Sequence, residues 1–359
     1  MDAMQLSAKD LAKGRLQVPV YRALYLNKML EEHEEIAGSR DRRFRKIIRD
    51  FGNLKDADAE VPESLVSVLR RYQVQGYQWI HLLKAFGFGG ILADDMGLGK
   101  TLQVIAVLLS EMENGNTVPS LVICPASLVY NWQEEIRRFA PALQSVTVTG
   151  TREERLQILQ NARNARTQDV FITSYDLLKR DIADYEGLTF RWQILDEAQY
   201  IKNPKTASAR SVKIIQSSYR LALTGTPIEN RLSELWSIFD FLMPGFLYGY
   251  ETFRRQFETP IVKNKDAAVT ERLQKMAAPF ILRRLKKDVL KDLPDKLEEV
   301  RYCGFEPEQQ RLYDAQVTHL KTVLAASDNP NTDKIAILAE LTKIRQICCD
   351  PSLLFENYT

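Results

Sequence analysis

The sequence is poor in cysteine, in histidine and in long apolar runs, and each scarcity excludes a class of protein. The cysteines number four and the histidines three; no two cysteines form a C-x-x-C pair, and the histidines lie far apart. A structural zinc site needs closely spaced ligands, so we predict no metal other than one that arrives with a bound nucleotide. We interpret the thiols as buried, in a reducing, intracellular compartment. The cysteines are Cys124, Cys303, Cys348 and Cys349.

The chain also lacks a membrane-spanning run and any large excess of charge. Nowhere do 18 apolar residues follow one another, and the first residues form no charged segment followed by an apolar stretch. We therefore expect a soluble protein with no membrane partner, which is not secreted through a signal peptide. Lysine and arginine number 49 against 47 aspartate and glutamate, a net charge of +2. Any surface for nucleic acid must then be a local patch.

The composition that is present is typical of a globular protein large enough for two lobes. Hydrophobic residues make up 45% and charged residues 27% of 359 residues. Such a chain buries a large core, and its length favours two lobes or one large domain with appendages.

The first 60 residues carry a helical pattern. An apolar stripe at helical spacing runs through Leu24, Leu26, Met29 and Leu30. The basic run at residues 40–46 either touches phosphates or forms a solvated helix face, and we favour the solvated face.

Short apolar runs, each followed by a polar loop and a helical pattern, begin after residue 61. Continuous runs of this kind are typical of strands in a parallel sheet covered on both faces, because such strands have no polar side. We therefore predict an α/β fold, with ligands bound at the carboxyl ends of the strands. After Thr224 we expect helices and no further strands. The predicted strands are Gly90–Ala93, Leu121–Cys124, Val170–Thr173, Gln193–Asp196 and Leu221–Thr224.

A glycine-containing loop follows the first of these runs. Gly97 and Gly99 allow backbone N–H groups to curl around phosphate oxygens, and the helix that follows adds its positive dipole end. Lys100 would reach the β- and γ-phosphates, and the Thr101 hydroxyl would hold Mg²⁺. The strict phosphate-loop pattern has glycine where this chain has Asp94, so an ordinary strand-to-helix turn is the alternative interpretation.

An acid pair ends the fourth run. Asp196 is placed to hold the Mg²⁺ shell, and Glu197 to orient and deprotonate an attacking water. Alone, such a pair is usually a solvated loop, but the upstream Lys-Thr loop favours the catalytic interpretation. Upstream of the phosphate loop, residues 69–79 offer an amide, aromatic rings and arginines suited to a purine, although we assign Trp79 to the core.

Five blocks follow one another in the chain: Ile91–Thr101, Cys124–Trp132, Asp196–Gln199, Leu223–Asn230 and Phe280–Arg284. In this order they resemble the SWI/SNF type of double-stranded-DNA translocase and remodeller, within the helicase-like ATPases of superfamily 2. The resemblance spans about residue 66 to the end of the chain.

The resemblance implies a RecA-like, three-layer parallel sheet with helices on both faces. Residues 1–60 would form a helical N-terminal segment and 61–230 the first ATPase lobe. Residues 231–300 would form a helical protrusion that returns to this lobe, and 301–359 the connection to a second lobe and its truncated start. Implied partners are double-stranded DNA, the second lobe of a longer chain and an unidentified protein target.

The resemblance also assigns roles to individual residues. Gln73 would read the adenine, and the roles of Lys100, Thr101, Asp196 and Glu197 agree with those derived from their chemistry. Nucleotide contacts would come from Arg70, Gln73, Gly97, Gly99, Lys100, Thr101 and Leu102. Phosphates of one DNA strand would lie along Pro125, Ser127, Asn131, Trp132, Thr173, Ser174 and Tyr175. Coupling of nucleotide state to DNA would fall to Gln199, Thr224, Gly225 and Thr226.

Two departures from the family pattern matter. Gln199 stands where other branches of the superfamily have His or Asp, which agrees with a bacterial member and hence with a cytoplasmic, nucleoid-associated protein; a eukaryotic member would be nuclear. No second set of strand-end motifs follows Pro294, so the arginines that a second lobe presents to the γ-phosphate are missing. Hydrolysis by this chain alone is therefore expected to be weak.

Two other functions remain open at this stage. A strand-separating helicase of the same superfamily would unwind a tailed duplex. A non-catalytic ATP-binding scaffold would be expected to carry a degenerate site, against which the intact Lys100, Asp196 and Glu197 argue.

Overall fold

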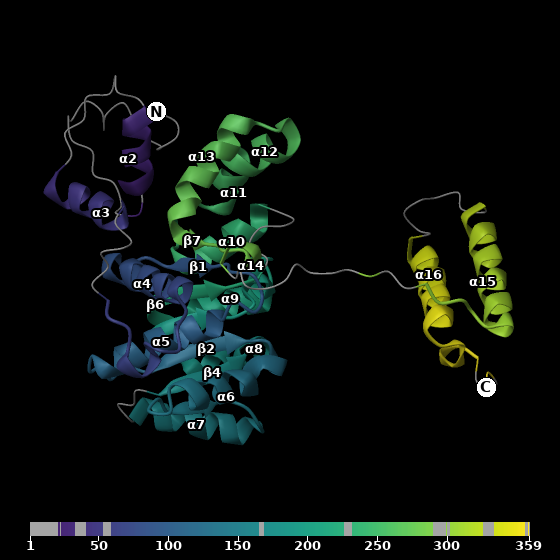
Figure 1. The fold of residues 1–359 in the computed structure, drawn as a ribbon, viewed down its shortest axis with the longest axis horizontal. Helices are drawn as coiled ribbons and strands as arrows, with labels where there is room; N and C mark the ends of the chain where they lie inside the picture. The colour runs from purple at the N-terminus through teal and green to yellow at the C-terminus, as the bar shows by residue number, and fades with distance from the viewer. Residues whose placement is uncertain are drawn as a thin grey trace. The chain divides into compact units, whose positions relative to one another are not determined.

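The computed structural model divides the chain into two compact units, Met1–Leu293 and Pro294–Thr359, which are described separately (Figure 1). The structure describes residues 21, 23–32, 41–52, 59–164, 169–225, 232–289, 299, 302–325, 334–355 and 358.

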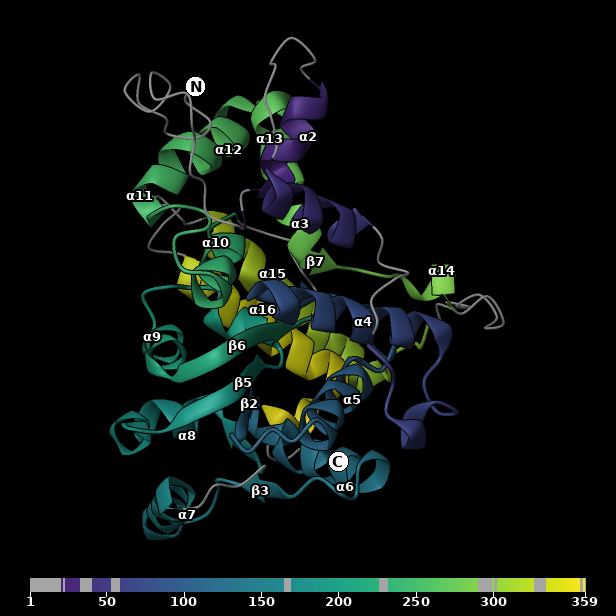
Figure 2. The ribbon, with the colours of Figure 1, turned by 90° about the vertical axis from the view of Figure 1, so that its left-hand side faces the viewer.

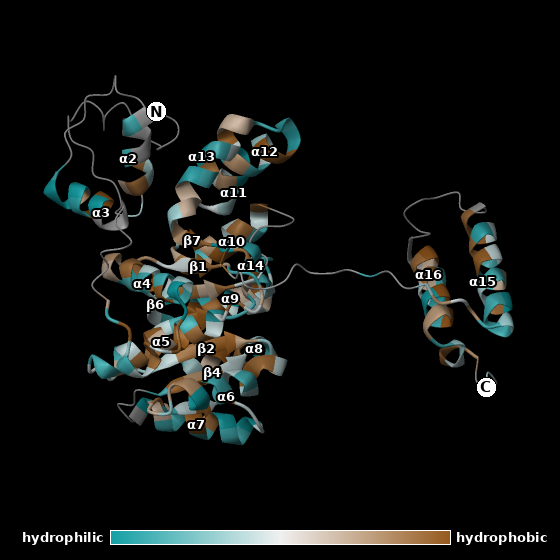
Figure 3. Cartoon of the chain, in the orientation of Figure 1, coloured by the Kyte–Doolittle hydropathy of each residue, from teal (hydrophilic) through white to brown (hydrophobic). Residues whose placement is uncertain are grey.

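The first unit is built on a seven-stranded, wholly parallel sheet in the order β3-β4-β2-β5-β6-β1-β7. All five predicted strands are present in it, which confirms the α/β prediction. Their interiors are buried because helices cover both faces, and Figure 3 shows hydrophobic residues gathered along the central strands. The strands are β1 (Gly90–Leu92), β2 (Ser120–Cys124), β3 (Ser145–Thr147), β4 (Val170–Ser174), β5 (Thr189–Leu195), β6 (Gln216–Leu223) and β7 (Ile281–Leu282).

The two outermost strands were not predicted. The expectation that strands end at Thr224 is wrong, because β7 pairs with β1 through Ile91 and Ile281. Both β3 and β7 are two or three residues long and only partly buried, so they lack the continuous apolar run by which a central strand is recognised.

Helices cover both faces of the sheet, which confirms the three-layer prediction. In Figure 1, α4 and α5 lie on one side of the sheet and α8 and α9 on the other, and Figure 2 views the sheet from the α4–α5 side. Gly87, in the left-handed region at φ 69°, ends α4. The helices are α4 (Arg71–Phe86), α5 (Lys100–Glu113), α6 (Val129–Phe139), α7 (Arg152–Asn164), α8 (Tyr175–Arg180) and α9 (Ala207–Ile214).

A helical extension follows β6 and returns to the sheet at β7. Its base is an aromatic cluster in which the Phe246 ring meets Phe239 and Phe280, each with centroids 5.1 Å apart. Such packing anchors the helices to the sheet. They are α10 (Leu232–Leu242), α11 (Tyr250–Phe253), α12 (Thr259–Asn264) and α13 (Ala267–Ala277), followed after β7 by α14 (Lys286–Val289).

Two N-terminal helices, α2 (Ala23–Glu32) and α3 (Arg42–Gly52), pack on this unit. The Tyr21 ring meets Phe246 edge-on at 5.4 Å, and Ile47 of α3 is buried. Several cations of the basic run, including Arg43 and Lys46, lie on the exposed side of α3. Among the described helices, none is both long and apolar enough to cross a membrane.

The second unit contains a pair of packed helices, α15 (Pro307–Ala325) and α16 (Lys334–Cys349). The prediction of buried thiols is correct only for Cys124, which lies in β2. Cys303, Cys348 and Cys349 are exposed. Among the described residues of this unit, no element covers these three side chains, which explains the error.

Candidate active site

The phosphate loop, residues 94–101, connects β1 to α5 at the carboxyl edge of the sheet. Gly97 and Gly99 have φ angles of 83° and 70°, in the left-handed region that favours glycine. Gly99 is the N-cap of α5, so the first turn of that helix, Lys100–Leu102, directs its free N–H groups at the loop. The loop therefore has the backbone shape of an anion site.

Lys100 lies inside this loop. Its Nζ donates a hydrogen bond of 2.8 Å to the carbonyl of Asp94. Burial lowers the pKa of Lys100, while the nearby carboxylates of Glu197 and Asp196 oppose that shift. The loop lysine and the acid pair, about 100 residues apart in sequence, thus share one electrostatic environment. A bound phosphate would replace the Asp94 carbonyl as the hydrogen-bond acceptor of Lys100 Nζ.

Asp94 stands where the strict phosphate-loop pattern has glycine. Its φ is not positive, so this position does not require glycine. Its carboxylate is fully buried and is paired with the guanidinium of Arg284. The residue that departs from the strict pattern is therefore one partner of a buried ion pair.

Asp196 directly follows β5 and is 7% exposed. Its Oδ2 accepts a hydrogen bond of 2.9 Å from Nε1 of Trp132, and its Oδ1 accepts one of 2.9 Å from the backbone N–H of Glu197. Burial raises the pKa of this carboxyl despite these bonds. A cation beside it would relieve that cost.

Glu197 has an unusual backbone conformation, and its side chain belongs to a series of hydrogen-bonded polar groups. Its φ of 50° lies in the left-handed region, a conformation that non-glycine residues adopt mainly where the surroundings impose it. Gln199 donates through Nε2 to Oε2 of Glu197 at 2.6 Å, and the Thr224 hydroxyl donates to Oε1 of Gln199 at 3.2 Å. The acid pair is thereby joined to the end of β6. Gly225 follows, where an added Cβ would lie 3.2 Å from Cγ of Met96 in the phosphate loop.

Thr226, the last predicted coupling residue, lies outside the described residues.

Gln73 lies beneath the phosphate loop, on the first turn of α4. Its Nε2 donates to the Leu98 carbonyl at 3.1 Å, and its Oε1 accepts from the backbone N–H of Arg70 at 2.9 Å. The Tyr72 hydroxyl also donates to Leu98, at 3.2 Å. Gln73 is 6% exposed, and these two bonds leave its amide one further donor and one further acceptor site. The Arg70 side chain is exposed.

The predicted DNA contacts divide into exposed and buried residues. Ser127 and Asn131 are exposed at the start of α6, whereas Pro125 and Trp132 are buried. Thr173, Ser174 and Tyr175 are buried, and their contact with DNA phosphates stays a prediction.

These three hydroxyl side chains are buried and committed to the protein. Thr173 donates to the Val148 carbonyl, Ser174 caps α8 by accepting from Leu177 N–H, and Tyr175 donates to the Asp196 carbonyl at 2.8 Å. They shape the carboxyl ends of β4 and β5.

The donor set suits Mg²⁺ delivered with a nucleotide. The described residues contain no cluster of three or more His, Cys, Asp or Glu side chains that would hold a metal unaided. Mg²⁺ prefers oxygen ligands and completes its octahedron with phosphates and water. One buried carboxylate, Asp196, and the hydroxyl of Thr101 match that requirement.

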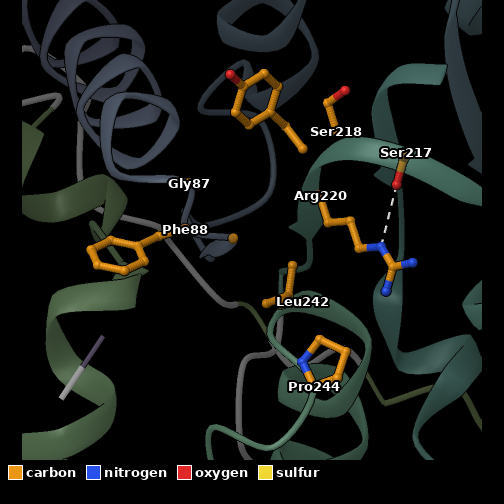
Figure 4. A pocket seen from close by; sticks show the side chains of 9 residues that line it. Gly87, Phe88, Ser217, Ser218, Arg220, Leu242 and Pro244 are labelled. Carbon is orange, nitrogen blue, oxygen red and sulfur yellow. Dashed lines mark hydrogen bonds between the residues drawn. The ribbon is translucent and has the colours of Figure 1, made fainter. Parts of the chain in front are cut away.

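A separate hollow of about 270 Å³ lies at the opposite edge of the sheet. Gly87–Gly89 and Ser217–Arg220 line it, at the amino ends of β1 and β6 (Figure 4). The Arg220 guanidinium donates to Ser217 Oγ and to the Phe241 carbonyl, so its charge is held by the protein. This hollow is not part of the nucleotide site.

Sequence reasoning missed two partners of the site. The resemblance predicts Trp132 as a DNA contact and does not predict its bond to Asp196. Arg284 enters the sequence analysis only as the last residue of the Phe280–Arg284 block, with no role in the nucleotide site. The signal for Arg284 was the unexpected acid at position 94, since a buried carboxylate needs a cation.

Comparison with known proteins finds matches to one family along most of the chain. A family model described as "SNF2-related domain" matches residues 72–353, and one described as "Bacterial SNF2 helicase associated" matches residues 1–62. The "Uncharacterized ATP-dependent helicase MG018" of Mycoplasma genitalium is 42% identical over 293 residues, which are 81% of this chain and 27% of that protein.

A second relative and a solved structure extend the comparison. "TATA-binding protein-associated factor MOT1" of Saccharomyces cerevisiae is 36% identical over 348 residues, with 89% of this chain and 18% of that protein covered. The structure "Sulfolobus solfataricus SWI2/SNF2 ATPase core in complex with dsDNA" is 42% identical with a TM-score of 0.58, covering 81% of this chain and 60% of that one. This chain thus spans about a quarter or less of these two curated relatives, and it belongs to the SNF2-related family of helicase-like ATPase domains.

Proposed function

We propose that the chain is the ATP-binding lobe of a DNA-dependent ATPase that translocates on double-stranded DNA and remodels protein–DNA complexes. The hydrogen-bonded chain from Glu197 through Gln199 to Thr224, beside Lys100 of the phosphate loop, carries the proposal. A site of this kind supplies a phosphate cradle, an acid for the metal and an acid for the water, as phosphoryl transfer requires.

Each group has a defined task in this proposal. Lys100 exchanges the Asp94 carbonyl for the β- and γ-phosphate oxygens, and Gln73 and Arg70 hold the adenine. Asp196 and Thr101 would hold Mg²⁺, which neutralises phosphate charge when bound.

Glu197 orients a water toward the γ-phosphorus. A new P–O bond forms as the bond to the ADP oxygen breaks, and Glu197 takes the proton of the water. Its imposed backbone conformation and its bond from Gln199 fix the direction of the carboxylate.

The route to DNA runs through α6. Ser127, in the turn before α6, and Asn131, in its first turn, expose polar side chains, and Trp132 of the same helix is bonded to Asp196. Contacts of this kind to the phosphate backbone position a protein without reading bases. A shift of α6 on DNA would therefore reach the acid that holds Mg²⁺.

The relatives' greater length supports a second lobe in the intact protein, which would supply arginines to the γ-phosphate. Loss of such an arginine costs on the order of 10³ or more in rate. In a bacterium such a protein would be nucleoid-associated, and in a eukaryote it would be nuclear. Its target would be another DNA-bound protein.

The test is ATP turnover by this chain and by a longer natural chain that contains it, each with and without duplex DNA. We expect DNA to stimulate the longer chain strongly and this chain weakly. Glu197→Gln in the longer chain should retain ATP binding and abolish turnover, while Glu134→Gln, an exposed acid on α6, should change neither. Turnover that Glu197→Gln leaves intact would exclude Glu197 as the base, and unwinding of a tailed duplex would favour a strand-separating helicase.

A further inference from the structure

Arg284, which follows β7, bonds to three separate parts of the nucleotide site. Its Nε donates to Oδ1 of Asp94 at 2.8 Å, and its Nη2 donates to Oδ2 of the same carboxylate. Nη2 also donates to Oε1 of Gln103 in α5, at 2.7 Å, and Nη1 donates to the backbone carbonyl of Tyr72 in α4. One side chain thus joins the loop, the helix that follows it and the helix that carries Gln73.

The pairing takes place away from solvent. Asp94 is 0% exposed and the Arg284 side chain is 11% exposed. The guanidinium also lies over the Tyr72 ring, 5.2 Å from its centroid. Buried bidentate pairs of this geometry fix both partners in direction as well as in charge.

The backbone around Arg284 is bonded to the loop as well. Ala93 N–H donates to the Leu282 carbonyl at 2.7 Å, and Asp95 N–H donates to the Arg284 carbonyl at 3.0 Å. Lys286 N–H donates to Oδ2 of Asp95 at 3.0 Å. Hydrogen bonds therefore connect the loop to the segment 282–286 beyond the end of the β1–β7 pairing.

Charge gives this arrangement a consequence for phosphate binding. Asp94 places a negative charge at the entry of a loop that must receive a polyanion, and its own carbonyl is the acceptor of Lys100. Arg284 neutralises the carboxylate and holds the residue, so that the carbonyl and the N–H groups beyond it keep their directions.

We propose that Arg284 is a positioning residue of the nucleotide site, which holds the phosphate loop, α5 and the start of α4 in the arrangement that receives ATP. This rests on the proposed function, because it concerns the same ATP site. Arg284 acts through Asp94, Gln103 and Tyr72 and does not itself touch the nucleotide.

The experiment compares Arg284→Ala, Arg284→Lys and the double variant Asp94→Asn/Arg284→Gln, with Arg283→Ala as the matched control on an exposed neighbour. The readouts are the Kd for Mg·ATP and the Tm without nucleotide. Arg284→Ala leaves a buried charge unpaired, so we expect a lower Tm and ATP binding weakened at least about tenfold. Arg284→Lys keeps the positive charge but loses the planar, bidentate guanidinium. Its Tm and its Kd for Mg·ATP should therefore lie between those of Arg284→Ala and of the unchanged chain.

The double variant separates positioning from charge neutralisation. With both charges gone it should regain Tm, yet bind Mg·ATP about tenfold more weakly than the unchanged chain, because the geometry is lost. Full recovery of ATP affinity in the double variant would mean that Arg284 only neutralises the Asp94 charge, which would overturn the positioning role. Unaltered ATP affinity in Arg284→Ala would overturn it as well. Failure of the unchanged chain to bind Mg·ATP would instead overturn the proposed function.

Discussion

Nε1 of Trp132 donates a hydrogen bond of 2.9 Å to Oδ2 of Asp196. The bond joins α6, near whose start Ser127 and Asn131 are exposed, to the acid that follows β5. Both side chains are buried, so neither can exchange this partner for water. A buried acceptor that loses its donor bears a desolvation cost, so this bond is expensive to break. It directly connects the proposed DNA-contacting helix with the proposed metal-binding acid.

Trp132→Phe should therefore weaken both stability and nucleotide use. The ring volume is largely kept, but the buried Asp196 loses a donor, at a cost of about 1–3 kcal/mol. The Asp196 pKa should rise further, and Mg·ATP affinity should fall. Thermal unfolding and nucleotide titration measure the two effects. Tyr130→Phe, on the same helix but 63% exposed, is the control and should leave both unchanged; equal behaviour of the two variants would contradict the link.

The raised pKa of Asp196 predicts a pH dependence with a definite sign. Between the unfolded value of 3.8 and the higher folded value, the folded apo protein binds more protons than the unfolded chain, so this group's contribution to stability falls as pH rises. Mg·ATP requires the ionised form, so the stabilisation it gives should instead grow as pH rises through the folded pKa. Tm with and without Mg·ATP across this range measures the difference.

Asp196→Asn is the control for that titration, because it removes the ionisable group. The pH-dependent part of the Mg·ATP stabilisation should disappear in this variant. A slope that persists would assign the titration to another group.

Thr224→Val removes the hydroxyl that donates to Gln199. Gln199 still bonds to Glu197, so ATP binding should stay within about twofold, but the coupling of the acid pair to β6 is lost. We expect DNA-stimulated kcat of the longer chain to fall about tenfold, the loss equivalent to one hydrogen bond made in the transition state. Thr224→Ser keeps the donor and should remain near normal; a Thr224→Ser defect as large as that of Thr224→Val would point to packing.

Gly99→Ala and Gly87→Ala form a matched pair. Both glycines have φ near 70°, so each alanine should cost about 1 kcal/mol of strain. At Gly99 an added Cβ would also lie 2.4 Å from Nε2 of Gln73, whereas at Gly87 it would meet nothing within 4 Å. Unfolding experiments should show a lower free energy of unfolding in both variants. Only Gly99→Ala should weaken ATP binding, and an equal loss in Gly87→Ala would contradict the proposed geometry.

Much of the fold follows from local sequence. The apolar runs that became β1, β2, β4, β5 and β6 are legible because a strand covered on both faces must be apolar throughout. The edge strands β3 and β7 have no such requirement, and only pairing with β4 and β1 reveals them. The cysteines show a similar limit. Composition predicts that all four thiols are buried, but whether a thiol is covered depends on the elements packed around it, and only Cys124 is buried.

The sequence by itself determined the chemistry of the site: the glycines that shape the loop, Lys100 and Thr101 beside them, and the adjacent acids Asp196 and Glu197. Within the loop, and within the acid pair, the residues are near neighbours in the chain, so their local spacing makes each motif recognisable. Tertiary structure decided which groups support them. Arg284 reaches Asp94 across 190 residues, and Trp132 turns inward to Asp196 when its neighbours suggest a DNA contact. Spacing cannot encode such pairs, because their distance is set by the packing of β7 and α6 against the sheet.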